Sequence, residues 1–246
     1  EGGSFSAAVV VEGDGTMNVN GGSFTGTGRL DRVKYSGGAK GTVSGGSFAE
    51  LYLYGSGTAW LAGGSFTKLS TASSDVLRSL LADGAAYYDQ SGNAISNSAV
   101  SELNNVTVKT HTHTVDEQTG ICSVCQKQMA ASLTVGGTTS WYTAFATAIE
   151  AANAADGEKT ITLYQNVNGY ADGHSTTYEL THGPVTLATG GKSVTRANLT
   201  AKGISLTVTG SNGGFNVTVE GKDAELTVND KDTKLAIVTA QNGGKL

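Results

Sequence analysis

The sequence predicts an all-β protein: a right-handed parallel β-helix, or solenoid, with short capping helices and two modules joined by a small His/Cys knuckle. Three observations support this fold. A Gly-Gly-Ser-Phe tetrapeptide recurs, apolar and polar residues alternate between its copies, and the 246 residues include 35 Gly but only 15% charged residues. Self-similarity at a period of about 20 residues is typical of stacked coils. A glycine-rich chain with few charges suits short strands joined by tight turns.

The repeat becomes regular when it is measured from its apolar strands. The tetrapeptide recurs at irregular spacings, at Gly2–Phe5, Gly21–Phe24, Gly45–Phe48 and Gly63–Phe66. However, Val9, Val33 and Leu51 each lie 12 residues before the next Gly-Gly pair. The length variation therefore falls in one loop, which is longest around residues 26–32. A fixed segment with one variable loop is what stacked coils require.

Alternation along each strand assigns the two faces of the coil wall, because successive side chains point to opposite sides. The inward ladders are Val9/Val33/Leu51, Val11/Tyr35/Leu53 and Val19/Val43/Leu61. The outward positions are Val10/Lys34/Tyr52, Glu12/Ser36/Tyr54 and Asn18/Thr42/Trp60. Paired glycines allow positive φ at each corner, and we expect the Phe after each pair to stack on its counterpart in the next coil.

Residues 73–110 are predicted to close this solenoid. Ser74 is a good N-cap for a helix over Asp75–Ala82 with one apolar face, and Gly84 stands where such a helix ends. A helix there would cover strand edges that otherwise invite aggregation. The segment Tyr87–Ile95 predicts a β-hairpin around Ser-Gly-Asn.

The region 132–246 predicts a second helix-capped, β-rich module. Ser140 is expected to cap a helix that runs to about Ala155, with Phe145, Ala148, Ile149 and Ala152 on its apolar face. Short β-rich runs follow, separated by turns of Gly, Asn and Asp. A second solenoid is our interpretation, and an antiparallel sandwich fits the strand spacing almost as well.

These elements divide the chain into four parts. They are the Gly-Gly-Ser-Phe coils (1–72), the cap and hairpin (73–110), the knuckle (111–131) and the second module (132–246). The start, Glu1-Gly2-Gly3-Ser4-Phe5, resembles the middle of a repeat, so we expect a piece of a longer protein.

The knuckle carries the sharpest chemical motif. His111-Thr112-His113 is followed after eight residues by Cys122-Ser123-Val124-Cys125. Two His at i and i+2 on a strand face the same way, and a C-x-x-C turn directs two sulfurs to one point. The four side chains form a His₂Cys₂ set suited to tetrahedral Zn²⁺, with no position left for an activated water. A local Cys122–Cys125 disulfide with solvated histidines is the alternative that remains open.

A second candidate site is aromatic. Tyr52, Tyr54 and Trp60 all face outward in the predicted register, and we expect them to share one side of the stack as a partner-binding surface. The alternative is that residues 73–110 cover them.

Other function classes have little support. The net charge of −5, without a basic stripe, argues against nucleic-acid binding. The sequence contains no run of 18 apolar residues, so it does not predict membrane insertion. Candidate carboxylates do not align into a catalytic ladder, and no hydrolase, P-loop or metalloprotease motif occurs. We therefore expect a protein that is not an enzyme.

Several motifs together resemble large modular cell-surface proteins of gut-dwelling Gram-positive anaerobes. They are the Gly-Gly-Ser-Phe coils, Leu80-Leu81-Ala82-Asp83-Gly84 with Tyr87-Tyr88-Asp89, the knuckle, and Tyr142 with Ala148–Ala152. The resemblance covers most of the chain. It implies an extracellular, wall-attached, adhesin-like array, and some proteins of that kind bind host immunoglobulin or mucin glycans. We expect an extracellular surface module that recognises a host protein, with an immunoglobulin as the leading case. A glycan-binding adhesin module and a carbohydrate-active β-helix enzyme are the alternatives.

Overall fold

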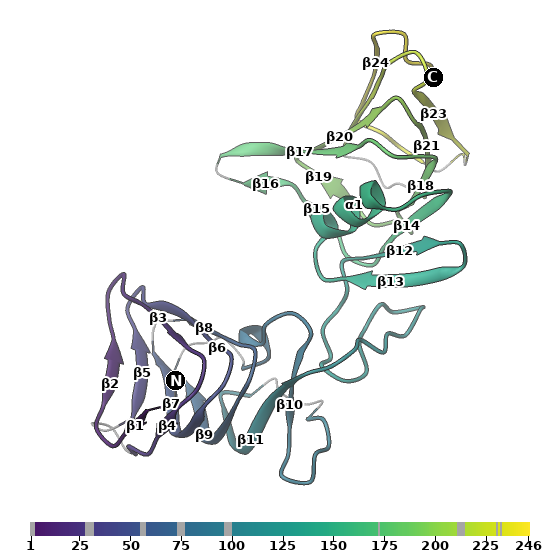
Figure 1. Cartoon of the computed structure of the whole chain (residues 1–246). Helices are drawn as coiled ribbons and strands as arrows, with labels where there is room; N and C mark the ends of the chain where they lie inside the picture. Colours follow the sequence, from purple (N-terminus) through teal and green to yellow (C-terminus); the bar gives the residue numbers. More distant parts are fainter. Residues whose placement is uncertain are drawn as a thin grey trace. The chain divides into compact units, whose positions relative to one another are not determined.

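The computed structural model divides the chain into two compact units, which are described separately (Figure 1). The first comprises Glu1–Thr114 with Cys122–Gln126, and the second comprises Val115–Ile121 with Lys127–Leu246. The structure describes residues 3–27, 32–54, 58–72, 77–95, 100–171, 173–210, 215–229, 231 and 233–246. In these residues no helix is both long and apolar enough to cross a membrane.

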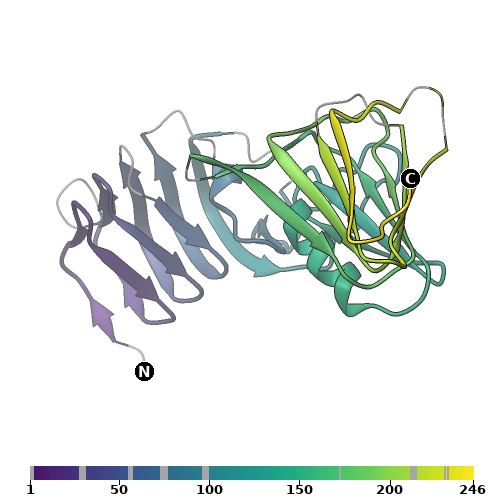
Figure 2. The same cartoon turned by 90° about the horizontal axis from the view of Figure 1, so that it is seen from above.

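Short parallel strands, stacked coil upon coil, build the first unit (Figure 2). They are β1 (Ser4–Phe5), β2 (Val9–Val11), β3 (Thr16–Val19), β4 (Ser23–Phe24), β5 (Val33–Ser36), β6 (Lys40–Val43), β7 (Ser47–Tyr54), β8 (Thr58–Leu61) and β9 (Gly64–Thr71). In one sheet, β1 pairs with β4 and β2 with β5, and both β4 and β5 pair with the longer strand β7, which in turn pairs with β9. Strands β3, β6 and β8 form a separate sheet. Val9 pairs with Val33 and Val33 with Leu51, all in parallel. The solenoid and its 12-residue register are confirmed.

The predicted inward ladders form the core of this unit. Tyr35, Val43, Leu51 and Leu61 are completely buried, while members of the first coil such as Val9 are partly exposed. The outward assignment of Ser36 was wrong. This residue is buried, and its hydroxyl lies 3.5 Å from the Val11 carbonyl oxygen.

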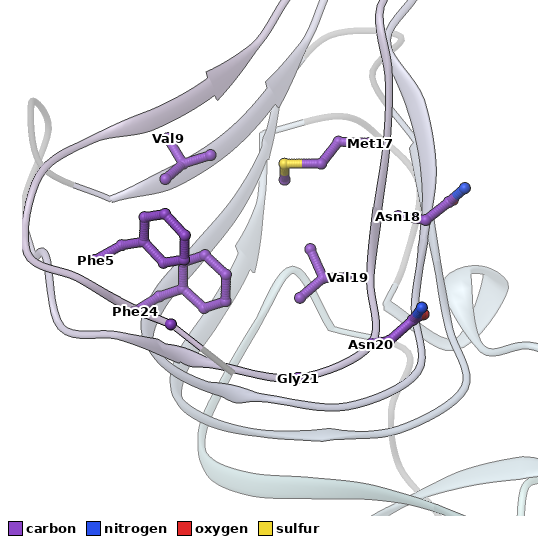
Figure 3. A pocket seen from close by; sticks show the side chains of 9 residues that line it. Phe5, Val9, Met17, Asn18, Val19, Asn20, Gly21 and Phe24 are labelled. Atoms are coloured by element: carbon purple, nitrogen blue, oxygen red, sulfur yellow. The ribbon is translucent and has the colours of Figure 1, made fainter. Parts of the chain in front are cut away.

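The four phenylalanines form the predicted stack. The ring centroids of Phe5 and Phe24 are 5.0 Å apart, those of Phe24 and Phe48 are 4.7 Å apart, and those of Phe48 and Phe66 are 5.0 Å apart. The interplanar angles do not exceed 12°. Around Phe5 and Phe24 the first coil encloses a hollow of about 610 Å³, lined mainly by inward apolar side chains (Figure 3).

In the pairs Gly45-Gly46 and Gly63-Gly64, the two glycines are needed for different reasons. The first has no room for a side chain: a Cβ atom at Gly45 would lie 2.6 Å from the Asn20 carbonyl oxygen, and one at Gly63 would lie 2.3 Å from that of Ser44. The second adopts positive φ, +102° at Gly46 and +112° at Gly64, a conformation that L side chains disfavour. Together they fix the corner at which one strand ends and the next begins.

An antiparallel cap follows the last coil. Strand β11 (Glu102–Thr110) pairs antiparallel with β9, and β10 (Ala85–Tyr88) pairs antiparallel with β11. The expected helix is a shorter 3₁₀ helix, η1 (Leu77–Leu80); its proposed N-cap, Ser74, lies outside the described residues. The predicted hairpin is present, with Tyr88 bridged antiparallel to Ala94.

Parallel coils also form most of the second unit. Its elements are β12 (Ala131–Val135), β13 (Thr138–Tyr142), α1 (Phe145–Ala154), β14 (Lys159–Leu163), β15 (Val167–Asn168), β16 (Tyr170–Ala171), β17 (His174–Leu180), β18 (Val185–Ala188), β19 (Val194–Thr195), β20 (Ala197–Lys202), β21 (Ser205–Thr209), β22 (Asn216–Glu220), β23 (Glu225–Val228) and β24 (Ile237–Gln241). Strands β14, β18, β21 and β23 pair in parallel, as do β17, β20, β22 and β24. The antiparallel sandwich is therefore excluded.

The start of α1 differs from the prediction. Ser140 belongs to β13, and the N-cap residue is Ala144, which has no side-chain hydrogen bond. The helix is positioned by burial, because its expected apolar residues, Phe145, Ala148, Ile149 and Ala152, are all buried. Strand β13 instead forms a hairpin with β12 through Gly136-Gly137, both at positive φ, as a type I′ hairpin turn requires.

Candidate functional site

The structure brings His111, His113, Cys122 and Cys125 together, and all four belong to the first unit. His111 directly follows β11, where its backbone N–H donates to the Gly84 carbonyl at 2.8 Å. The cysteines lie on a turn that is fastened to the same segment, since the Ser123 N–H donates to the Thr114 carbonyl at 2.8 Å. Backbone hydrogen bonds thus position both halves of the cluster.

The ligand atoms have the spacing of a tetrahedral metal shell. His111 Nε2 lies 3.5 Å from Cys122 Sγ, and His113 Nδ1 lies 3.7 Å from Cys125 Sγ. The ligand atoms of all four residues lie within 4.8 Å of one another. A zinc ion with Zn–S of about 2.3 Å and Zn–N of about 2.05 Å separates sulfur from nitrogen by about 3.6 Å in a regular tetrahedron. The cluster is therefore compatible with zinc.

The cysteines are buried thiols in this structure and form no disulfide. Burial raises the pKa of Cys122, but the backbone N–H of Cys125 and the side chains of His113 and His111 oppose it, and the net effect lowers the pKa of Cys122 to about 6. These groups stabilise the thiolate, which is the form that binds metal ions.

The ring nitrogens that face away from the sulfurs also fit a metal site. His111 Nδ1 and His113 Nε2 are buried and make no hydrogen bond to the described residues. His113 Nε2 lies 3.5 Å from Asp83 Oδ1, within reach of ionic attraction. Metal-bound histidines commonly direct the second nitrogen at a carboxylate, which fixes the tautomer. Asp83 has that position relative to His113.

The three predicted aromatic residues do not share one sheet. Tyr52 and Tyr54 are on β7, with ring centroids 5.9 Å apart, but Trp60 is on β8, in the sheet of β3 and β6. Tyr54 and Trp60 are 51% and 50% exposed. The expectation of a single face is therefore corrected, because Tyr54 and Trp60 belong to two different sheets.

Tyr52 is less accessible than Tyr54 because Arg32 covers its ring. The Arg32 guanidinium lies 3.7 Å from the Tyr52 ring centroid and 2.9 Å from Glu50 Oε1. Glu50 is thus engaged in an ion pair.

A further aromatic pair was missed in the sequence. Trp141 on β13 and Tyr164, just after β14, have ring centroids 5.1 Å apart. The assignment of Trp141 to a helix concealed it. The available signal was Gly136-Gly137 between two β-rich runs, which predicts a hairpin.

Comparisons with known proteins add no relative. No family model matches the chain, and no curated protein or solved structure matches it significantly.

Proposed function

We propose that this chain is a non-catalytic, zinc-stabilised β-solenoid module that binds a partner on the outside of a bacterial cell. The observation that carries the proposal is the closed His₂Cys₂ cluster at the end of a rigid stack of coils. Four protein ligands complete a tetrahedral shell, so the zinc has no position for substrate or water and its role is structural. The solenoid then serves as a scaffold for its outer faces.

Metal analysis tests the zinc site. Protein purified without chelators or an added His tag should contain about one zinc per chain, and the Cys122→Ser variant should contain almost none. Ser123→Ala is the matched control, because it changes the same turn but no ligand. Cobalt substitution should give thiolate-to-metal charge-transfer absorption. Stoichiometric zinc in Cys122→Ser, or a Cys122–Cys125 disulfide in the purified protein, would refute the site.

The proposed partner is a host protein, and an immunoglobulin is the leading case. Support comes from the resemblance to modular surface proteins and from the half-exposed Tyr54 and Trp60. Aromatic side chains of this kind supply large, rigid contact areas in protein interfaces.

A capture experiment on host secretions tests the partner. Recovery of antibody heavy chains by the immobilised protein would support the proposal, whereas recovery that is lost after deglycosylation would favour a glycan ligand. Release of new sugar ends would favour an enzyme. Because the aromatics lie on two sheets, Tyr54→Ser and Trp60→Ser should be tested separately. Loss of capture in one variant, with unchanged thermal stability, identifies the binding sheet.

A further inference from the structure

The second unit contains a shallow depression that the zinc site and the aromatics of the first unit do not involve. It has a volume of about 190 Å³ and lies over β12, β13 and β14. This is smaller than typical pockets for drug-sized ligands, which measure about 300–1,000 Å³. Its lining consists of Glu117, Ser132, Thr134, Thr139, Trp141, Thr162 and Tyr164. The site therefore offers two aromatic rings, three threonine hydroxyls and one carboxylate to a small ligand, while Ser132 is buried beneath it.

The two rings are held at an angle. The planes of Trp141 and Tyr164 are inclined by 52°, and both side chains are partly exposed. Gly120 lies close against Tyr164, since a Cβ atom at Gly120 would come within 2.5 Å of the ring. The absence of a side chain at Gly120 thus leaves the space that the Tyr164 ring occupies.

The lining carboxylate, Glu117, lies on a tight turn that the neighbouring Asp116 stabilises. The Asp116 side chain accepts hydrogen bonds from the Gln118 N–H at 3.1 Å and from the Thr119 N–H at 2.8 Å. The Thr119 hydroxyl also donates to it, at 2.8 Å. These bonds, the one from the Thr119 N–H above all, lower the pKa of Asp116. Asp116 is thus engaged within the turn, whereas the neighbouring Glu117 is exposed and lines the depression.

A row of threonines extends from the depression across the sheet. One threonine of each strand lies in register with the next, and every one is at least partly exposed: Thr139, Thr134, Thr160, Thr186, Thr207 and Thr227. Neighbouring strands are about 4.8 Å apart, so the row spans roughly 24 Å. The hydroxyls form a regular, uncharged surface next to the aromatic pair.

From this arrangement we infer that the outer face of the β13–β12–β14–β18–β21–β23 sheet binds a neutral saccharide chain, anchored at Trp141 and Tyr164. Aromatic rings pack against the apolar face of a sugar ring, and the hydroxyls and Glu117 meet its hydroxyl groups. The threonine row accommodates further sugar units. No Lys or Arg lines the depression, so an acidic sugar has no counterion there and meets the carboxylate of Glu117. The inference does not depend on the zinc site or on the host-protein partner.

Nuclear magnetic resonance tests the inference with an internal control. The chain contains 2 Trp, so its indole N–H region holds one signal from Trp141 and one from Trp60. Titration with defined neutral oligosaccharides, of mucin type and of bacterial wall-polysaccharide type, should move the Trp141 signal and leave the Trp60 signal in place. The two types distinguish a host source from a bacterial one. The same oligosaccharides with terminal sialic acid should bind at least tenfold more weakly.

Variants separate the two parts of the site. Trp141→Ala should weaken binding of every oligosaccharide at least tenfold, whereas Thr186→Lys should weaken only the longer ones. Tyr170→Ala is the control, because Tyr170 is also a half-exposed aromatic of this unit but lies on β16, in another sheet. If no oligosaccharide moves the Trp141 signal, if only the Trp60 signal moves, or if Trp141→Ala binds like the unmodified protein, the inference is wrong. The circular dichroism spectrum and thermal unfolding of each variant are measured in parallel, so a loss of the fold of the second unit is recognised.

Discussion

Gly41 shows how closely the coils approach each other at single positions. A Cβ atom there would lie 1.9 Å from the Met17 carbonyl oxygen and 2.9 Å from the Tyr35 ring. The same oxygen accepts a hydrogen bond from the Tyr35 hydroxyl at 2.9 Å. The glycine therefore allows an aromatic side chain with a satisfied hydroxyl group to fill the inside of the coil.

Replacing Gly41 tests this packing. The Gly41→Ala substitution should destabilise the first unit by at least about 2 kcal/mol, because neither the backbone oxygen nor the enclosed ring has room to move. Gly21→Ala is the control, since a Cβ atom at Gly21 meets nothing within 4 Å. Urea unfolding followed by circular dichroism measures both. Equal midpoints for the two variants would contradict the packing described.

A second residue-scale prediction concerns Asp83. Its carboxylate faces His113 Nε2 and also accepts the Gly84 N–H at 3.1 Å. Asp83→Asn retains an oxygen for Gly84 but removes the charge, so zinc affinity should fall about tenfold, while Asp83→Glu should restore part of it. Competition with a chromophoric chelator measures the affinity. Glu102→Gln, in an exposed ion pair with Lys68, should bind zinc normally. An unchanged affinity in Asp83→Asn would remove Asp83 from the metal site.

Among the elements, the phenylalanine stack joins one coil to the next. Phe48 is 1% exposed and contacts a ring on each side, whereas Phe5 is 47% exposed and stacks on one side only. Phe48→Ala should therefore cost about 3–5 kcal/mol, and Phe5→Ala should cost clearly less. Thermal unfolding of the two variants provides the comparison. Similar losses would mean that the stack does not connect the coils.

The sequence predicted the repeating elements most accurately, and its errors lie at the starts and lengths of the helices, which do not repeat. Gly-Gly pairs and apolar strands recur, so Val9, Val33 and Leu51 align by simple counting. The helix start at Ser140 was wrong because a good capping residue is only a local preference. The Gly136-Gly137 hairpin and the burial of Phe145 together place Ser140 in a strand.

The candidate sites differ in the same way in how far the sequence predicted them. The His/Cys cluster was visible because its ligands are close in sequence and of characteristic types. The prediction that Tyr54 and Trp60 share one face was wrong. Alternation shows which side of a strand a residue is on, but not whether two strands belong to the same sheet. Trp141 and Tyr164 are 23 residues apart in the sequence, and only the pairing of β12 with both β13 and β14 brings them together.

At the scale of the whole molecule, the four candidate metal ligands all lie in one of the two units, although part of the chain between them belongs to the other. Cys122–Gln126 belongs to the first unit, whereas the residues on either side of it in the sequence belong to the second. A zinc ion bound as proposed would join Cys122 and Cys125 to His111 and His113 and close a short loop of chain. A ligand that binds only the folded form stabilises that form by mass action. The stabilisation should therefore reach the first unit and not the second.

Hydrogen exchange with mass spectrometry distinguishes the two units in one experiment. Removing zinc with a chelator should speed exchange at residues 111–114 and 122–126, where Ser123 N–H and Gln126 N–H donate to backbone carbonyls at 2.8 and 2.9 Å. Faster exchange should extend to the cap strand β10, because the His111 N–H is bonded to Gly84 beside it. Strands β14–β24 should exchange at unchanged rates. Cys122→Ser without chelator should give the same pattern, and added zinc should reverse it only in the unmodified protein. Uniformly faster exchange in both units would show instead that the metal supports the fold of the entire chain.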